Sequence, residues 1–290
     1  MRIGILGTPD SPYVLQLQRA AVTYFPQVTA EVLRFGDLQI GTSSHASAAG
    51  QLAFDALIVR SMPIGSLEQV IFRMDCLQAW HSRGVPIHNP PRSLEIAIDK
   101  WLCLQRLLEA GVAVPPTICC QTRAAAMEAW EVLGGDVVVK PLFGGEGRGI
   151  LRASDKDMAW RMFGTLQQLG QVIYVQQFIE HFGYDIRVLC VGEKLYAIRR
   201  VAADGQWRTN ISQGSQAEPM QLTSAMEELA VRSRDAVGGT LLGVDLLPAR
   251  DGRLFILEVN AVPGWKGVAQ ALQVDIAKEF LQVVIKRLEA

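Results

Sequence analysis

The sequence predicts an α/β protein, and three patterns support this prediction. Apolar strand patterns alternate with helical patterns through residues 1–92, which is typical of a small doubly wound parallel sheet. Three valines lead into a glycine-rich segment in the middle of the chain. Two apolar strand patterns flank an Asp-Gly turn near its end. Because 290 residues are many for one core, we expect further α+β units at 93–172 and 173–290.

The first unit shows the alternation of strands and helices most clearly. The stretch "HNPPRS" at 88–93 is expected to be a linker, because its two prolines disfavour a helix. Ser93 is expected to cap the helix that follows. The expected strands are 2–7, 28–35, 55–60 and 85–88, and the expected helices are 10–23 and 66–83.

The second and third units mix helices with strands that lie closer together in sequence. The stretch "SLEIAIDKWLCLQRLLEAG" predicts a single helix that ends at Gly111. Ser154 and Ser224, each followed three residues later by an acid, have the spacing of a capping box. The expected strands are 137–140, 172–178, 184–192, 194–201, 241–247 and 253–259, and the remaining expected helices are 123–133, 224–237 and 275–287.

The composition limits the classes of function. The 28 basic residues are balanced by 29 acidic ones, so we expect no nucleic-acid partner. No apolar run approaches the ~20 residues that span a bilayer, so we expect no membrane partner. Five cysteines without a C-x-x-C pattern favour reduced thiols and a cytoplasmic protein. Four scattered histidines disfavour a zinc site.

The glycine-rich segment "VVVKPLFGGEGRGI", residues 137–150, indicates phosphate binding. A P-loop needs its lysine after the glycines, whereas here Lys140 precedes them. The first strand is not followed by a dinucleotide fingerprint, and the kinase motifs HRD and DFG do not occur. We therefore interpret the segment as a lysine at a strand end, placed to contact phosphate, beside a mobile glycine lid.

The two strands near the C-terminus carry a possible metal site. Asp245 and Glu258 are expected to lie side by side on adjacent antiparallel strands, and Asn260 shares the face of Glu258. Carboxylate and amide oxygens are the ligands that Mg²⁺ prefers. Carboxylates among apolar neighbours are costly unless they are paired or bind a metal. We therefore predict that these three residues bind Mg²⁺ or Mn²⁺.

Residues 93–288 resemble the ATP-grasp ligases, and specifically the RimK-like α-L-glutamate ligase branch. The resemblance implies an ATP-grasp fold of two α+β lobes preceded by a Rossmann-like domain. It also implies ATP with one or two Mg²⁺ ions and a homo-oligomer. The motifs that carry it are "DKWLCLQRLLEAGVAVPPT", "VVVKPLFGGEGRGI", "VQQFIE", "YDIRVLCVG", "IRRVAADGQWRTNISQG" and "GVDLL…LFILEVNAVPGW".

The resemblance also implies roles for individual residues. Arg187 and Arg200 would be catalytic and face the transferred phosphoryl group and the carboxylate substrate, while the metal set coincides with the one given above. Gln177 and Phe178 match the hinge whose backbone would hold the adenine, and the chain has Gln177 where the family usually has Glu, which matters little for a backbone contact. The implied ATP-binding residues are Lys100, Lys140, Gly144, Gly145, Glu146, Gly147, Gln177, Phe178, Asp185, Arg208, Thr209 and Asn210.

The implied reaction is an ATP-dependent carboxylate–amine ligation. L-Glutamate would be added to a small-molecule or peptide carboxylate acceptor, such as a protein C-terminus or a glutamyl-tailed pterin, through an acylphosphate. The segment "ISQGS" at 211–215 departs from the family's "ARGG", which leaves the acceptor open. The alternatives are a ligase for another amino acid or amine, an ATP-grasp small-molecule kinase, and a nucleotide sensor. Trp207 is expected to pack in the interior and His181 to lie on the surface.

Overall fold

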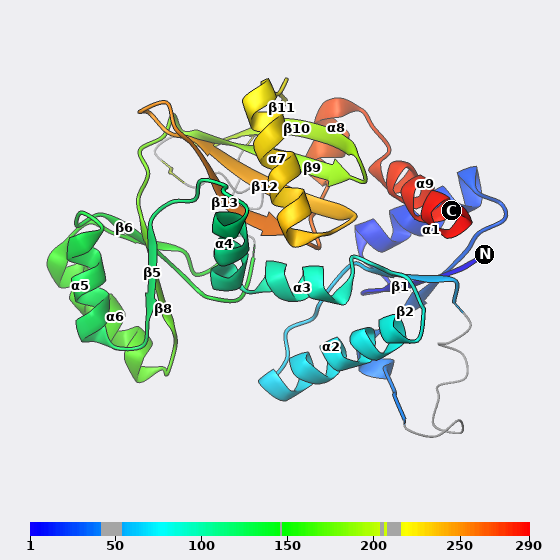
Figure 1. The fold of residues 1–290 in the computed structure, drawn as a ribbon, viewed down its shortest axis with the longest axis horizontal. Helices are drawn as coiled ribbons and strands as arrows, with labels where there is room; N and C mark the ends of the chain where they lie inside the picture. The colour runs from blue at the N-terminus through cyan, green and yellow to red at the C-terminus, as the bar shows by residue number, and fades with distance from the viewer. Residues whose placement is uncertain (42–53, 146, 204–205, 208–215) are drawn as a thin grey trace.

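The computed structural model describes residues 1–41, 54–145, 147–203, 206–207 and 216–290. Within these residues the chain forms three β-sheets, with helices packed on each (Figure 1). The two ends of the chain lie together, because α1 (Pro12–Tyr24) packs against α9 (Ile276–Glu289). No helix in the described ranges is long and apolar enough to cross a membrane.

The first sheet is parallel, with the strand order β2-β1-β3-β4, which confirms the predicted architecture of the N-terminal segment. The chain leaves β1 toward β2 on one side and later returns to β3 on the other. The carboxyl ends of β1 and β3 therefore form the switch point, where open α/β sheets bind ligands. The strands are β1 (Arg2–Leu6), β2 (Thr29–Leu33), β3 (Ala56–Val59) and β4 (Ile87–His88), with the 3₁₀ turn η1 (Phe35–Asp37) and α2 (Leu67–Ser82) between them.

The prediction of a linker at 88–93 is wrong. Asn89 is buried, and α3 (Pro91–Ile98) begins with a proline at its first position, where a missing N–H costs no hydrogen bond. The single helix predicted to run to Gly111 is also wrong, since Asp99 interrupts it. The Asp99 carboxylate accepts two backbone N–H bonds and so starts a new helix, α4 (Lys100–Glu109).

The second sheet is antiparallel, with the order β5-β8-β6-β7, and α5 and α6 lie against it (Figure 1). The third unit was expected to begin with strand β8, but β8 pairs with β5 and β6 in this second sheet. The division of the chain into three units remains a proposal. The predicted cap at Ser154 is wrong by one residue, because Asp155 accepts the Met158 N–H. The elements are β5 (Thr117–Cys120), α5 (Arg123–Val132), β6 (Val137–Lys140), β7 (Leu151–Ala153), α6 (Lys156–Gln168) and β8 (Ile173–Gln177).

The third sheet is antiparallel, with the order β11-β10-β9-β12-β13. Helices α3, α4 and α7 pack against its β13 edge. Thr223 caps α7, so the capping box predicted from Ser224 is wrong. The elements are β9 (Tyr184–Val191), β10 (Lys194–Val201), β11 (Gln216–Pro219), α7 (Ser224–Val237), β12 (Leu241–Pro248), β13 (Leu254–Asn260) and α8 (Lys266–Leu272).

The apolar core joins the first and third sheets more closely than it joins either to the second. One continuous cluster includes Leu57 of the first sheet, Leu107 of α4 and Val244 of the third sheet. The second sheet and its helices have a separate core around Phe163 and Val175. The second sheet and its helices therefore form a lobe with a core of its own, which touches the main cluster through Tyr174 of β8.

Asn89 ties the first sheet to the third through four hydrogen bonds. Its amide group donates to the carbonyls of Leu241 at 2.7 Å and Ala261 at 2.6 Å. Its carbonyl oxygen accepts the N–H groups of Thr240 at 2.5 Å and Leu241 at 2.9 Å. The residue is 2% exposed, so water cannot replace these bonds.

We predict that Asn89→Ala lowers the free energy of unfolding by about 3 kcal/mol, because it leaves buried backbone groups without partners. Chemical denaturation followed by circular dichroism measures the change. Gln168→Ala, at an exposed position, is the control and should alter stability by less than about 0.5 kcal/mol. An Asn89 variant as stable as the control would contradict the assigned bonds.

Candidate active site

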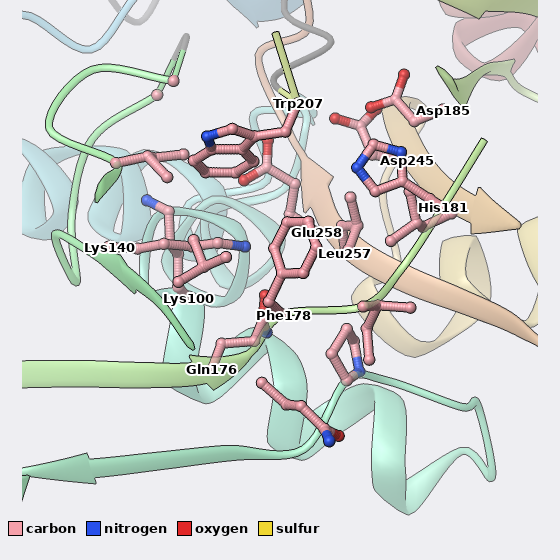
Figure 2. A pocket seen from close by; sticks show the side chains of 18 of the residues that line it. Lys100, Lys140, Gln176, Phe178, His181, Asp185, Trp207, Asp245, Leu257 and Glu258 are labelled. Carbon is pink, nitrogen blue, oxygen red and sulfur yellow. The ribbon is translucent and has the colours of Figure 1, made fainter. Parts of the chain in front are cut away.

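A cavity opens between the second sheet and the third, and Figure 2 shows the side chains that line it. Its walls come from the glycine-rich segment after β6, the segment after β8, and one face of β10, β12 and β13. Lys100 and Lys140 lie at one side of the view, and Asp185 and Asp245 at the other (Figure 2). The cavity therefore has a cationic side and a side rich in paired charges.

Two lysines from different elements meet on the cationic side. Lys140 ends β6 and is buried, while Lys100 begins α4 and donates from its Nζ to the Gly144 carbonyl at 2.6 Å. Burial lowers the pKa of Lys140 to about 8; the Glu258 carboxylate opposes this shift, and the charge of Lys100 adds to it. Burial also lowers the pKa of Lys100. A group that restores charge balance here must be anionic.

The glycine-rich segment borders the same side of the cavity. Gly144, Gly145 and Gly147, which were expected to bind ATP, line it. Gly144 has φ = 117° and Gly147 has φ = 71°, a backbone conformation that residues with a Cβ rarely adopt. The backbone can thus approach a ligand closely at these positions. Glu146, which was expected to contact ATP, lies outside the described residues.

The segment after β8 forms an aromatic wall. Gln177 and Phe178 line the cavity, but the N–H of Gln177 donates to Pro116 and that of Phe178 to Asp136. Both N–H groups are thus already used within the protein, and neither is available to the adenine ring that this backbone was expected to hold. A donor to the adenine ring has to come from a different N–H group. The Phe178 ring lies edge-on to Trp207, with 5.9 Å between ring centroids, and this pair offers an apolar surface for a flat ring.

A row of paired charges covers the face of the third sheet. Arg200 binds Asp185 from β9, with 2.7 Å between Nε and Oδ1, and lies 3.0 Å from the Oδ2 of Asp245 in β12. Arg187 binds the same Asp245, with 2.9 Å between Nη2 and Oδ2. The strand register accounts for these pairs, because Asp185 lies opposite Arg200 and Arg187 lies opposite Asp245.

The row shifts the pKa values of its members. Burial raises the pKa of Asp245, but Arg187 and Arg200 lower it further, so this carboxylate stays ionised. Burial lowers the pKa of Arg200, and the carboxylates of Asp185 and Asp245 raise it by more. Arg200 lines the cavity, whereas Arg187 lies along the row behind it.

The predicted metal ligands meet on one face, as the spacing implied. Asp245 lies directly opposite Glu258, and the Asn260 amide donates to the Glu258 carboxylate at 3.0 Å. The oxygens of Glu258 and Asn260 suit Mg²⁺. Both oxygens of Asp245 are already bound by arginines, so this residue fits a metal less directly. No cluster of three His, Cys, Asp or Glu side chains occurs within the described ranges.

Some expectations for the site cannot be placed, and two were wrong. Arg208, Thr209 and Asn210 lie outside the described residues. Trp207 and His181 were expected to be a packing residue and a surface residue, but both line the cavity. Their proximity in sequence to the expected nucleotide-contacting motifs was the signal that could have identified them.

The sheets, the glycine-rich segment and the two lysines together define the ATP-grasp class. The chain matches the RimK-like ATP-grasp domain over residues 97–284, and it belongs to this family.

The chain is similar over nearly its whole length to a curated enzyme. It is 32% identical to the tetrahydromethanopterin:alpha-L-glutamate ligase of Methanosarcina acetivorans, over 98% of this chain and 99% of that protein. It is 31% identical to a probable alpha-L-glutamate ligase of Pasteurella multocida, over 82% of this chain and 75% of that protein. The fold matches the ATP-grasp ligase PsnB solved with a minimal precursor, Mg and ADP, at a TM-score of 0.76 and 20% identity, over 99% of this chain and 97% of that one.

We predict that binding of ATP at pH 8 makes the protein take up roughly half a proton, because Lys140 is half neutral near its pKa of about 8 and phosphate raises that pKa. Affinity for ATP should accordingly fall as the pH rises through 8. Titration calorimetry in buffers of different ionisation enthalpy measures the uptake. Lys140→Arg, which stays charged, should abolish it. Equal uptake by the variant and the unaltered protein would contradict the prediction.

Proposed function

We propose that the protein is an ATP-dependent carboxylate–amine ligase that adds L-glutamate to a carboxylate acceptor. The observation that carries this proposal is the arrangement of the cavity. Lys100 and Lys140 stand beside the glycine-rich segment on one side, and Arg200 with Asp245 and Glu258 lines the other. A triphosphate bound along the lysines would present its γ-phosphate to the arginine side. The names of the curated relatives support glutamate as the amino acid.

The proposed reaction has two steps. An oxygen of the acceptor carboxylate attacks the γ-phosphorus of ATP, which forms an acylphosphate and releases ADP. The amine of glutamate then attacks the acyl carbon, loses a proton and expels inorganic phosphate as the amide forms. A carboxylate is unreactive toward amines until its oxygen becomes a leaving group, so the phosphorylation provides the activation.

The side chains contribute charge and orientation more than covalent chemistry. Lys100 and Lys140 neutralise phosphate oxygens, which stabilises charge in the transition state. Arg200 is held by Asp185 and Asp245 through its Nε and Nη2, so the guanidinium cannot turn away. Arg187 remains the second proposed catalytic arginine, held in the same row. Mg²⁺, when bound at Glu258 and Asn260 with Asp245 beside them, would neutralise further phosphate charge.

The acceptor that we propose is an acid ending in a glutamyl group, either a pterin-type cofactor or a peptide. The relative from Methanosarcina acetivorans is named for a pterin, whereas the structural neighbour PsnB is solved with a precursor. We also propose a homo-oligomer in the cytoplasm. The five free cysteines of the structure are compatible with a reducing compartment.

We predict that ADP release from ATP and Mg²⁺ depends on both L-glutamate and one acceptor from a panel of glutamyl-tailed pterins and peptides ending in glutamate. The product should gain the mass of one glutamyl residue for each phosphate released. A coupled ADP assay with mass spectrometry measures both. Release that follows another amine would replace glutamate in the proposal, and a phosphorylated acceptor without free phosphate would indicate a kinase.

We predict that Glu258→Gln lowers kcat at least about 100-fold, because it removes the anionic ligand proposed to hold Mg²⁺ against the phosphates while keeping the shape of the side chain. The same ADP assay gives kcat. Glu218→Gln is the matched control: Glu218 belongs to the same sheet but pairs with the exposed Arg199. Full activity in the Glu258 variant would overturn its assignment to the metal.

A further inference from the structure

Arg60 is a buried arginine at the switch point of the first sheet. It follows β3 directly, its backbone N–H donates to the Leu6 carbonyl at the end of β1 at 2.8 Å, and it is 4% exposed. In open α/β sheets this edge, between strands that lead off in opposite directions, is where ligands bind. The fold therefore places a guanidinium group where a ligand would be expected.

The Arg60 guanidinium has no carboxylate partner among the described residues. Its Nη2 donates to the Pro263 carbonyl at 2.9 Å, while Nε and Nη1 are buried without an acceptor. The guanidinium lies over two aromatic rings, 4.3 Å from the Trp265 centroid and 5.2 Å from that of Tyr13. Burial lowers the pKa of Arg60 to about 9. A buried cation with unused donors is costly unless an anion joins it.

A second buried arginine, in the helix between β3 and β4, shows what is unusual here. Arg73 on α2 is 9% exposed and also donates to a proline carbonyl, that of Pro63, at 2.7 Å. It also lies near an aromatic ring, that of Phe35. None of the Arg73 nitrogens is a buried donor without an acceptor, whereas two of the Arg60 nitrogens are. Of these two buried arginines, only the one at the switch point therefore has guanidinium nitrogens without an acceptor among the described residues.

Pro263 connects Arg60 to the catalytic face. It lies three residues beyond the proposed metal ligand Asn260. A Cβ placed on Gly243 would stand 3.0 Å from both the Pro263 ring and the Nη1 of Arg187. The Pro263 ring and the Arg187 guanidinium therefore both flank Gly243, and the Pro263 carbonyl accepts the hydrogen bond from Arg60.

We propose that Arg60 binds a substrate carboxylate that does not react, and so orients the substrate from the switch point of the first sheet. This inference rests on the proposed ligase function. The glutamate amine is the reacting group, so both of its carboxylates stay free to bind Arg60; a second carboxylate of the acceptor is the other source. A carboxylate offers two acceptor oxygens and one negative charge, which match the unused donors. Because the unused nitrogens of Arg60 are buried, this binding requires the half-buried Tyr13 ring, which lies 5.2 Å from the guanidinium, to move aside.

The test compares Arg60→Met with Arg73→Met as the matched control, using steady-state kinetics for ATP, glutamate and acceptor. We expect Arg60→Met to raise one substrate KM about 10- to 100-fold and to leave the KM for ATP unchanged. Two glutamate analogues, glutamine and the α-amide of glutamate, each lack one carboxylate charge. If Arg60 binds one of the two glutamate carboxylates, the analogue that lacks this carboxylate should be a poor substrate of the unaltered enzyme, and Arg60→Met should not make it poorer.

The outcomes show which substrate supplies the carboxylate, and they distinguish failure of the Arg60 proposal from failure of the ligase proposal. A raised KM for glutamate assigns the carboxylate to the amine donor, and a raised KM for the acceptor assigns it to the acceptor. Unchanged KM values for both overturn the proposal, even if the thermal stability of the variant falls. If Arg60→Met does not fold, Arg60→Gln, which keeps two donors without the charge, serves for the same comparison. An unaltered enzyme that ignores glutamate overturns the ligase proposal and this inference with it, whereas an active enzyme with an indifferent Arg60 variant overturns only the inference.

Discussion

The active face depends on one row of buried opposite charges on the third sheet. Asp185, Arg200, Asp245 and Arg187 alternate in sign across three neighbouring strands, and each is paired with the next. Buried charges are tolerated only when they are paired in this way. A slip of one residue in strand register would move these side chains to the opposite face and leave them unpaired. The row thereby holds the strands in the register that also presents Glu258 to the cavity.

On the cationic side of the cavity, by contrast, a buried charge is left without a salt-bridge partner in the described ranges. Lys140 is buried at the end of β6 and forms no salt bridge within the described part of the chain, and its pKa is lowered accordingly. Arg60 also has no carboxylate partner among the described residues, at the switch point of the first sheet. Such positions reduce the stability of the folded protein, and they are expected where an anionic substrate supplies the missing charge. Paired charges thus form the framework of the site, and we propose that the cations without carboxylate partners are its binding groups.

Much of the site could be predicted where the relevant residues are close in sequence. Asp245 and Glu258 were placed opposite each other because a short Asp-Gly turn joins two strands of alternating pattern, and the structure confirms the pairing. Lys140 and the glycines line the cavity as the strand-to-loop pattern indicated. Local patterns did not reveal the break at Asp99, because the apolar spacing continues through it while the side chain caps a new helix. They also did not reveal that both oxygens of Asp245 are occupied by arginines, which depends on pairing between three strands.

The sequence by itself determined the family, most strands and helices, and the residue types that we propose bind phosphate and metal. These depend on periodicity, turn chemistry and motifs that short segments carry alone. Only the tertiary structure decided which distant groups share the cavity. Lys100 joins Lys140, and Trp207 faces Phe178, because separately packed lobes bring them together. Arg60 meets Pro263 across 203 positions of the chain for the same reason. Contacts of this kind arise from packing and strand order, and no local pattern in the sequence encodes them.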